Sequence, residues 1–208
     1  PWQQLRTRTN AEIRYIDIDD EARLKLDNLD ALLDGAKLLA ITAASNVTGT
    51  LVDIKPLVEK AHAVGALVLV DACQYAPHLK IDVQDWDADF IAFSAHKMLG
   101  PTGIGVLWGK EELLEAMPTF LGGGSMISDV RLDDFDAAEL PAKFEAGTPA
   151  FIEAIGTAEA INYLERVGFD NIETHEKELT KYALDMFQNR FGNALILHGP
   201  LSAENRLG

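Results

Sequence analysis

Polar side chains that can do chemistry follow three apolar runs in the first half of the chain. They are Asn46 after the first run, Asp71 and Gln74 after the second, and Ser94, His96 and Lys97 after the third. In open α/β sheets, ligands bind beyond the carboxyl ends of the strands. If the three runs form parallel strands, we expect carboxylate, amide, hydroxyl, imidazole and amine groups to line one crevice.

This set of groups matches what pyridoxal 5'-phosphate (PLP) requires. PLP needs a lysine amine for its aldehyde and a carboxylate at its ring nitrogen, because a protonated ring is the better electron sink. It also needs a donor at its phenolic oxygen and polar groups at its phosphate. The residues that would meet these needs are Lys97, Asp71, Gln74, Ser94 and His96. A protonated His96 would also help to keep the Lys97 amine neutral by like-charge repulsion.

Each of these residues also has an ordinary interpretation. Most lysines are solvated surface groups, Asp71 and Asn46 could simply stabilise turns, and Ser94 could be no more than a strand-end hydroxyl. Lys97 differs from the other lysines because it follows a buried run and stands just before a Gly-Pro turn. The combination is therefore more specific than any single member.

The apolar runs and helix signals predict an α/β fold with a mainly parallel sheet flanked by helices. The expected strands are residues 37–42, 66–70, 89–94 and 103–108. The fourth follows the third so closely that we expect it to return antiparallel. Asp53 as N-cap and Gly65 as stop predict a helix through Val64.

The second half of the chain carries helix signals after a long irregular stretch. Residues 118–147 lack clear periodicity and are long for a plain connector, which indicates function or contacts. Before this stretch we expect a short helix at 110–117. After it we expect a helix with Thr148 as N-cap, Pro149 at its first position and Gly168 just past its end. A further helix from the capping-box pair Asp170 and Glu173 to about Arg190 and a strand at 194–197 would follow.

Composition narrows the class of protein. The 208 residues are enough for one domain, and 48% are apolar, which argues against disorder. No apolar run approaches the length of a membrane span, and the N-terminus resembles neither a signal nor a transit peptide. The net charge of -15 makes nucleic acid and anionic membranes poor partners. A single cysteine, Cys73, fits the reducing cytoplasm.

Five segments resemble class V, fold-type I PLP enzymes. Residues 70–74 (VDACQ) are similar to that family's V-D-G-A-Q, residues 94–103 (SAHKMLGPTG) to its S-x-H-K-x-x-G-P-x-G, and residues 45–50 (SNVTGT) to its S-N-V-x-G-T. Residues 122–127 (GGGSMI) and 144–149 (FEAGTP) resemble its SufS-type cysteine desulfurase branch in particular. The resemblance runs along essentially the whole chain.

The resemblance implies a reaction and a role for each residue. Lys97 would hold PLP as a Schiff base and move protons at the substrate carbon. The other implied roles are Asp71 at the pyridinium, Gln74 at the phenolic oxygen, Ser94 and His96 at the phosphate, Asn46 near the ring edge and substrate carboxylate, and Thr148 at the phosphate of the neighbouring subunit of a homodimer. L-Cysteine would become L-alanine and an enzyme persulfide. A SufE- or SufU-type acceptor protein would take the sulfur towards iron–sulfur cluster assembly.

The resemblance also implies that parts of the catalytic set lie elsewhere. We expect residues 1–208 to be a partial PLP-binding large domain that lacks an upstream segment and the C-terminal small domain, with residues 191–208 starting the C-terminal region. The family's stacking histidine, substrate-binding arginine and nucleophilic cysteine would lie outside this chain. Cys73 stands where the family carries a small residue, which favours a structural role over nucleophilic attack.

Three other interpretations remain open. The chain could belong to another class V enzyme, such as an aminotransferase or an epimerase-like relative, and a selenocysteine lyase-like activity is close to the leading one. It could instead be a catalytically silent module that only dimerises. A nicotinamide-binding domain fits poorly because no G-x-G-x-x-G fingerprint is present.

Overall fold

Four strands form the central sheet of the computed structural model, which describes residues 1–208. The strands are β1 (Leu38–Thr42), β2 (Leu67–Asp71), β3 (Phe90–Ser94) and β4 (Gly105–Gly109), and they lie side by side in that order. β1, β2 and β3 are parallel, and β4 returns antiparallel to β3. The predicted α/β class, the mainly parallel sheet and the antiparallel return are therefore confirmed.

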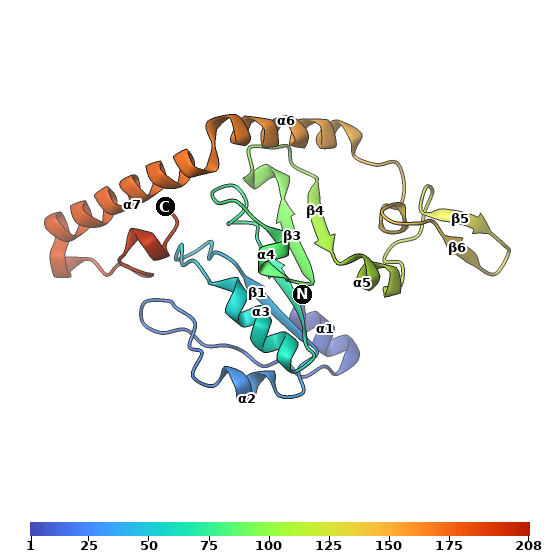
Figure 1. Cartoon of the computed structure of the whole chain (residues 1–208), viewed down its shortest axis with the longest axis horizontal. Helices are drawn as coiled ribbons and strands as arrows, with labels where there is room; N and C mark the ends of the chain where they lie inside the picture. Colours follow the sequence, from blue (N-terminus) through green and yellow to red (C-terminus); the bar gives the residue numbers. More distant parts are fainter.

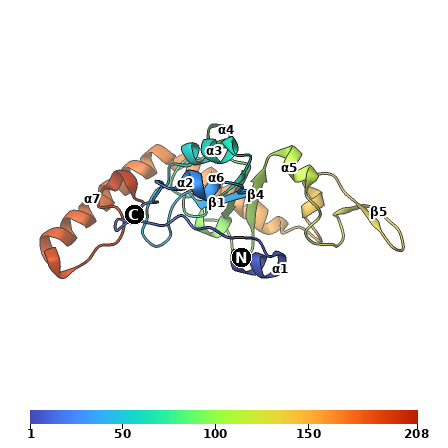
Figure 2. The same ribbon diagram turned by 90° about the horizontal axis from the view of Figure 1, so that it is seen from below.

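The core lies between this sheet and the helices on one of its faces. Val68 and Val70 alternate along β2 and are fully buried, as expected for a β-branched central strand. Helix α3 (Ile54–Ala63) buries Leu57, Val58 and Ala61 against the sheet. Helix α4 (Val83–Trp86) lies beside α3, and both are seen together in Figure 2. α2 (Leu29–Leu33) closes the same core with its two buried leucines.

The later helices extend away from the sheet. In Figure 1, α6 (Phe151–Val167) crosses above the sheet and α7 (Phe169–Phe191) continues to one side. On the opposite side projects a hairpin of β5 (Ile127–Val130) and β6 (Phe135–Ala137). The remaining elements are α1 (Trp2–Thr9), η1 (Ala95–Lys97), α5 (Glu111–Ala116), η2 (Ala142–Phe144), η3 (Gly192–Ala194) and η4 (Ala203–Asn205). No helix combines the length and the apolar character that a membrane crossing requires.

Several element boundaries differ from the sequence predictions. Ala150, and not Thr148, is the N-cap of α6, because Pro149 precedes the helix in a turn whose carbonyl accepts from the Phe151 amide at 2.8 Å. Gly168 alone separates α6 from α7, so Asp170 lies inside the first turn of α7 and caps nothing.

One further prediction about local structure was wrong. The strand at 194–197 is absent: residues 192–194 form η3, and Ile196 is 78% exposed. A short apolar run without a neighbouring strand has no partner for its backbone groups. The irregular stretch 118–147 contains the β5–β6 hairpin, whose turn is held by Arg131 on Asp129, Asp134 and Asp136. Asp53 precedes α3 as predicted, but its side chain accepts no capping hydrogen bond.

Candidate active site

The carboxyl ends of three parallel strands bring most of the candidate residues to one edge of the sheet. Asp71 is the last residue of β2 and is in register with Thr42 of β1 and Ala92 of β3. Ser94 ends β3, and the 45–50 loop follows β1 after a short turn. Helix α6 lies beyond this edge, where its Leu164 packs on Met98 (Figure 1). The edge is therefore bounded by sheet and helix.

Lys97 is held by a tight turn that begins at the end of β3. The carbonyl of Ala95 accepts hydrogen bonds from the amides of Met98 at 2.8 Å and Gly100 at 2.9 Å. Leu99, between them, has a φ of 62°, a left-handed conformation that is uncommon for a residue other than glycine. Strained backbone of this kind clusters at functional sites. The turn fixes the backbone of Lys97 while leaving its side chain half-buried and without an ion pair.

Cys73 links the ends of β2 and β3. Its amide donates to the Asp71 carboxylate at 3.0 Å, and its Sγ lies 3.5 Å from the Ser94 hydroxyl. Partial burial raises the pKa of the Cys73 thiol, and the Asp71 carboxylate raises it further. The Ser94 hydroxyl and the Lys97 charge act in the opposite direction. The pKa of the Cys73 thiol is thus affected by Asp71, Ser94 and Lys97 together.

The other candidate residues lie at different distances from this centre. Gln74 is half-buried one residue after Cys73, and His96 is exposed beside Lys97. Asn46 is exposed in the 45–50 loop, which follows β1, two strands away from β3. Thr148 is exposed in the connection from η2 to α6 and makes no hydrogen bond with the rest of the set. The chain alone therefore brings Asp71, Gln74, Ser94, His96 and Lys97 to the ends of the neighbouring strands β2 and β3, whereas Asn46 follows β1 and Thr148 precedes α6.

A second polar cluster, to which the sequence patterns drew no attention, lies at the opposite edge of the sheet. Asp89, only 3% exposed, accepts from His62 Nε2 at 2.8 Å, from the Val68 amide at 2.7 Å and from Lys110 Nζ at 3.1 Å. Burial alone would raise the Asp89 pKa, but these donors hold it below its usual value. The cluster joins α3 to the starts of β2 and β3 and is structural. The available signal was an acidic residue placed directly before a buried strand.

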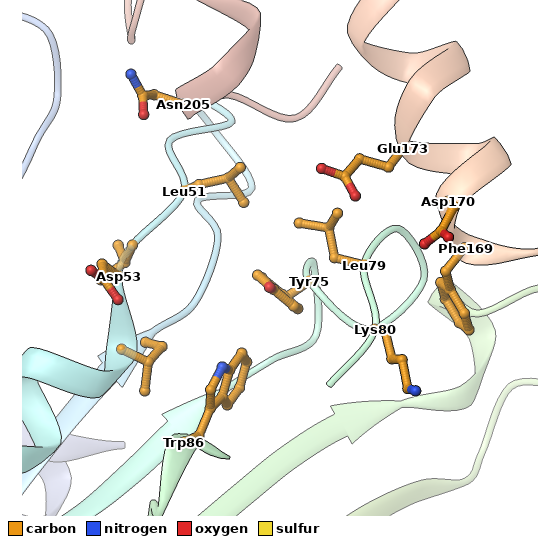
Figure 3. A pocket seen from close by; sticks show the side chains of 12 residues that line it. Leu51, Asp53, Tyr75, Leu79, Lys80, Trp86, Phe169, Asp170, Glu173 and Asn205 are labelled. Atoms are coloured by element: carbon orange, nitrogen blue, oxygen red, sulfur yellow. The ribbon is translucent and has the colours of Figure 1, made fainter. Parts of the chain in front are cut away.

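A cavity of about 470 Å³ lies beside the candidate site and shares no residue with it. Figure 3 shows Tyr75 and Trp86 among the side chains that line it, and their rings meet edge to face with centroids 5.0 Å apart. Burial raises the pKa of Tyr75, and the carboxylates of Glu173 and Asp53 raise it further. The other labelled residues are Leu51, Leu79, Lys80, Phe169, Asp170 and Asn205. We place the candidate site at the strand ends because the amine, carboxylate and hydroxyl groups converge there.

Comparison with known proteins agrees with the motifs. The family model described as aminotransferase class-V matches residues 1–206. The chain belongs to this family. Its members use PLP. A probable cysteine desulfurase from Streptomyces coelicolor is 46% identical over 99% of this chain and 49% of its own length. Another from Staphylococcus epidermidis is 50% identical over 96% of this chain and 48% of its own length.

Solved structures of class V relatives share the fold. An apo cysteine desulfurase from Thermococcus onnurineus superposes with a TM-score of 0.90 at 35% identity, covering 99% of this chain and 51% of that one. The Escherichia coli cysteine desulfurase CsdA gives a TM-score of 0.85 at 35% identity, covering 97% of this chain and 51% of that one. This class V chain therefore spans about half the length of the curated relatives and solved structures that it matches.

Proposed function

We propose that this chain supplies the PLP-binding part of a SufS-type cysteine desulfurase. The observation that carries the proposal is the convergence of Asp71, Ser94 and Lys97 around Cys73, in a chain 44–50% identical to proteins named cysteine desulfurases. We further propose that residues 1–208 are a partial large domain and that residues 191–208 begin the C-terminal region, in keeping with the half-length coverage of its relatives.

The donor set fits PLP in its chemistry. At neighbouring strand ends, an amine can meet the aldehyde of PLP, a carboxylate can meet its ring nitrogen, and a hydroxyl can meet its phosphate. When bound, PLP supplies an electron sink for charge that develops on the substrate carbon. The Asp71 carboxylate would hold a proton at the ring nitrogen, and the Gln74 amide would donate to the phenolic oxygen. Ser94 and His96 would donate to the phosphate.

Lys97 has two tasks in this proposal. Its amine would hold the cofactor by its aldehyde, and the same amine would take or give a proton at the substrate carbon. The tight turn after β3 supports this role, because it fixes the backbone while the side chain stays free to move between the two positions. Asn46 would lie near the ring edge and the substrate carboxylate.

The remaining partners of the reaction are proposals of the same kind. We propose a cytoplasmic homodimer in which Thr148 reaches the phosphate bound by the neighbouring subunit, and a SufE- or SufU-type protein that accepts the sulfur for iron–sulfur cluster assembly. The exposure of Thr148 outside its own strand-end edge supports a contact with a second copy. Neither nucleic acid nor a membrane is a partner in this proposal.

Cys73 does not serve as the persulfide-forming nucleophile in this proposal. Its raised pKa leaves little thiolate at neutral pH, and thiolate is the nucleophilic form. Since Cys73 is the one cysteine among the 208 residues, we expect the chain alone to release neither alanine nor sulfide from L-cysteine. Sulfide release by the purified chain would contradict this assignment.

The test of the cofactor role is titration with PLP, followed by visible absorbance. Wild-type protein is expected to develop the band of a lysine-bound cofactor, and Lys97→Ala to lose it. Lys80→Ala is the matched control, because Lys80 is an exposed lysine that lines the neighbouring cavity. Identical spectra from wild type and Lys97→Ala would refute the lysine assignment.

A catalytically silent dimerising module is the second candidate function. The apolar side chains that α6 exposes, among them Phe151 at 58% and Ile155 at 70%, favour it. Its signature would be a dimer that binds no PLP. The coarser alternative, another class V enzyme such as an aminotransferase or an epimerase-like relative, would bind PLP through Lys97 and fail to act on cysteine when the complete protein is assayed.

A further inference from the structure

The 45–50 loop, which carries Asn46, is paired with a segment about 150 residues further along the chain. Residues 205–207 lie antiparallel to residues 49–51: the Leu51 amide donates to the Asn205 carbonyl at 3.0 Å, and the Leu207 amide donates to the Gly49 carbonyl at 2.8 Å. The backbone of the loop on one side of the candidate site is therefore fixed by the 198–207 segment, which none of the motifs includes.

Arg206 ties this segment together. Its Nη1 donates to the carbonyl oxygens of His198 at 3.0 Å and Pro200 at 3.3 Å, so that one guanidinium joins both ends of the segment. Hydrogen bonds from a charged donor are stronger than those between neutral groups. Pro200 and Leu207 are buried, and a Lys177–Glu204 ion pair of 2.8 Å attaches the segment to α7. The segment is thus held against α7 on one side and the loop on the other.

Two glycines allow the loop and the segment to approach this closely. Gly49 has a φ of +70°, and a Cβ there would lie 2.5 Å from the Leu207 carbonyl oxygen. Gly199 has a φ of +96°, and a Cβ there would lie 2.5 Å from the Thr48 carbonyl oxygen. Real Cβ atoms essentially never come so near an oxygen, so any other residue at either position would separate the two backbones.

The loop itself is closed by its own hydrogen bonds. The Ser45 amide donates to the Thr50 carbonyl at 2.9 Å, the Gly49 amide donates to the Ser45 carbonyl at 3.0 Å, and the hydroxyls of Thr48 and Thr50 lie 2.8 Å apart. Asn46 makes none of these bonds and stays exposed. The loop is closed by its own hydrogen bonds and is paired with residues 205–207, so its backbone holds Asn46 in one position.

We infer that Arg206 is a positioning residue, which acts through the 198–207 segment to fix the 45–50 loop and hence the place of Asn46 at the cofactor-binding edge. The inference rests on the proposed function, since it assigns Asn46 a part in PLP binding. The coupling between Arg206 and the loop conformation, however, stands on the contacts alone and can be measured without cofactor.

The experiment compares PLP affinity and amide exchange in matched variants of the chain. Arg206→Ala removes both guanidinium bonds and Arg206→Lys restores one charged donor. Gly199→Ala drives a Cβ into the loop, and Gly192→Ala is its control: Gly192 also has a positive φ, of 48°, but a Cβ there would meet nothing within 4 Å. Asn46→Ala and the double variant Asn46→Ala/Arg206→Ala complete the set.

We expect Arg206→Ala and Gly199→Ala to weaken PLP binding about three- to tenfold, the loss of roughly one net hydrogen bond. Arg206→Lys is expected to recover most of the affinity, and Gly192→Ala to match wild type. Because Arg206 acts through Asn46, the double variant should bind no more weakly than the weaker of the two single variants. Fully additive losses would mean that Arg206 only stabilises the fold, and would overturn the inference.

Amide exchange separates failure of this inference from failure of the proposed function. In Arg206→Ala the amides of Gly49 and Leu207 should exchange with solvent about tenfold faster than in Gly192→Ala. The reason is that the segment can open in this variant without the cost of breaking the guanidinium hydrogen bonds. Unchanged protection of these amides would disprove the coupling, whatever PLP does. A wild-type chain that gives no Lys97-dependent PLP band would refute the proposed function, and the exchange rates would still decide whether Arg206 holds the loop.

Discussion

The sheet unit, residues 29–109, and the arm helices α6 and α7 differ sharply in how they are packed. The sheet unit contains a continuous core of fully buried aliphatic side chains from α2, α3 and the strands. In α7, by contrast, Thr180 is the single buried residue among 23, and α6 buries three of its 17. The residues gathered at the candidate site are thus positioned by a unit that packs against itself. The arms expose apolar surface that residues 1–208 do not cover.

The largest expected difference between the two regions is the cost of removing a leucine. Leu57→Ala empties a site that is 2% exposed in the sheet core, and we expect it to lower the free energy of unfolding by about 3–4 kcal/mol. Leu179→Ala removes a side chain that is 53% exposed on α7 and should change it by no more than about 0.5 kcal/mol. Urea unfolding of both variants measures the contrast. Equal losses would mean that the arms share the core.

A similar contrast in stability is expected for two aspartates that both pair with basic side chains. Asp89→Ala leaves the buried Val68 amide without an acceptor and should cost about 3 kcal/mol. Asp136→Ala, at the exposed Arg131 in the hairpin, should leave the unfolding midpoint nearly unchanged.

The Asp89 contribution also has a pH signature. Because the pKa of Asp89 is lowered in the folded protein, its stabilisation is complete above the usual carboxyl value of about 3.9 and is lost as the pH falls through the folded value. The free energy of unfolding, measured between pH 7 and pH 3, should therefore decrease more steeply with falling pH for wild type than for Asp89→Ala. Parallel curves would rule out the ionised carboxylate as the source of the stability.

The exposed face of α6 should make the chain self-associate. Ile152 and Ile155 are 68% and 70% exposed and lie one turn apart on the same face of the helix. We expect gel filtration to give a species larger than a monomer, and Ile152→Lys/Ile155→Lys to shift it towards the monomer. Ile18→Lys, at an isoleucine outside α6 that is 51% exposed, is the control. A monomeric wild type would show that the arm surface does not drive association.

The smallest expected effect concerns the Cys73 thiol. Because the pKa of the Cys73 thiol is raised, we expect slow alkylation by iodoacetamide at neutral pH. The rate should keep increasing with pH beyond the point at which an ordinary cysteine is fully ionised. Asp71→Asn should speed the reaction a few-fold and Lys97→Ala should slow it, because their charges act on the thiol in opposite directions. A rate indifferent to both substitutions would place neither charge near Cys73.

The same contrast explains which features the sequence could predict. The continuous apolar run of β2 and the Asp53 and Gly65 signals around α3 are local, and the elements they predict are present. Local spacing also predicts helix starts at Thr148 and Asp170, but the turn at Pro149 and the single-residue joint at Gly168 move both of them.

Long-range contacts were the part of the structure that local patterns could not reveal. The motifs gave the strand ends, and parallel pairing brings these together by geometry. The bond of His62 to Asp89 joins residues 27 positions apart, and the approach of Gly199 to Thr48 depends on how α7 returns to the sheet. Neither residue type nor sequence spacing indicates that such distant residues come into contact.

The lysine that bonds to PLP can be identified directly. The chain is incubated with PLP, the product is fixed with borohydride, and the modified peptide is located by mass spectrometry. We expect one dominant modification, at Lys97, that disappears in Lys97→Ala without moving to another residue. A modification spread over exposed lysines such as Lys80, or unchanged in Lys97→Ala, would contradict it.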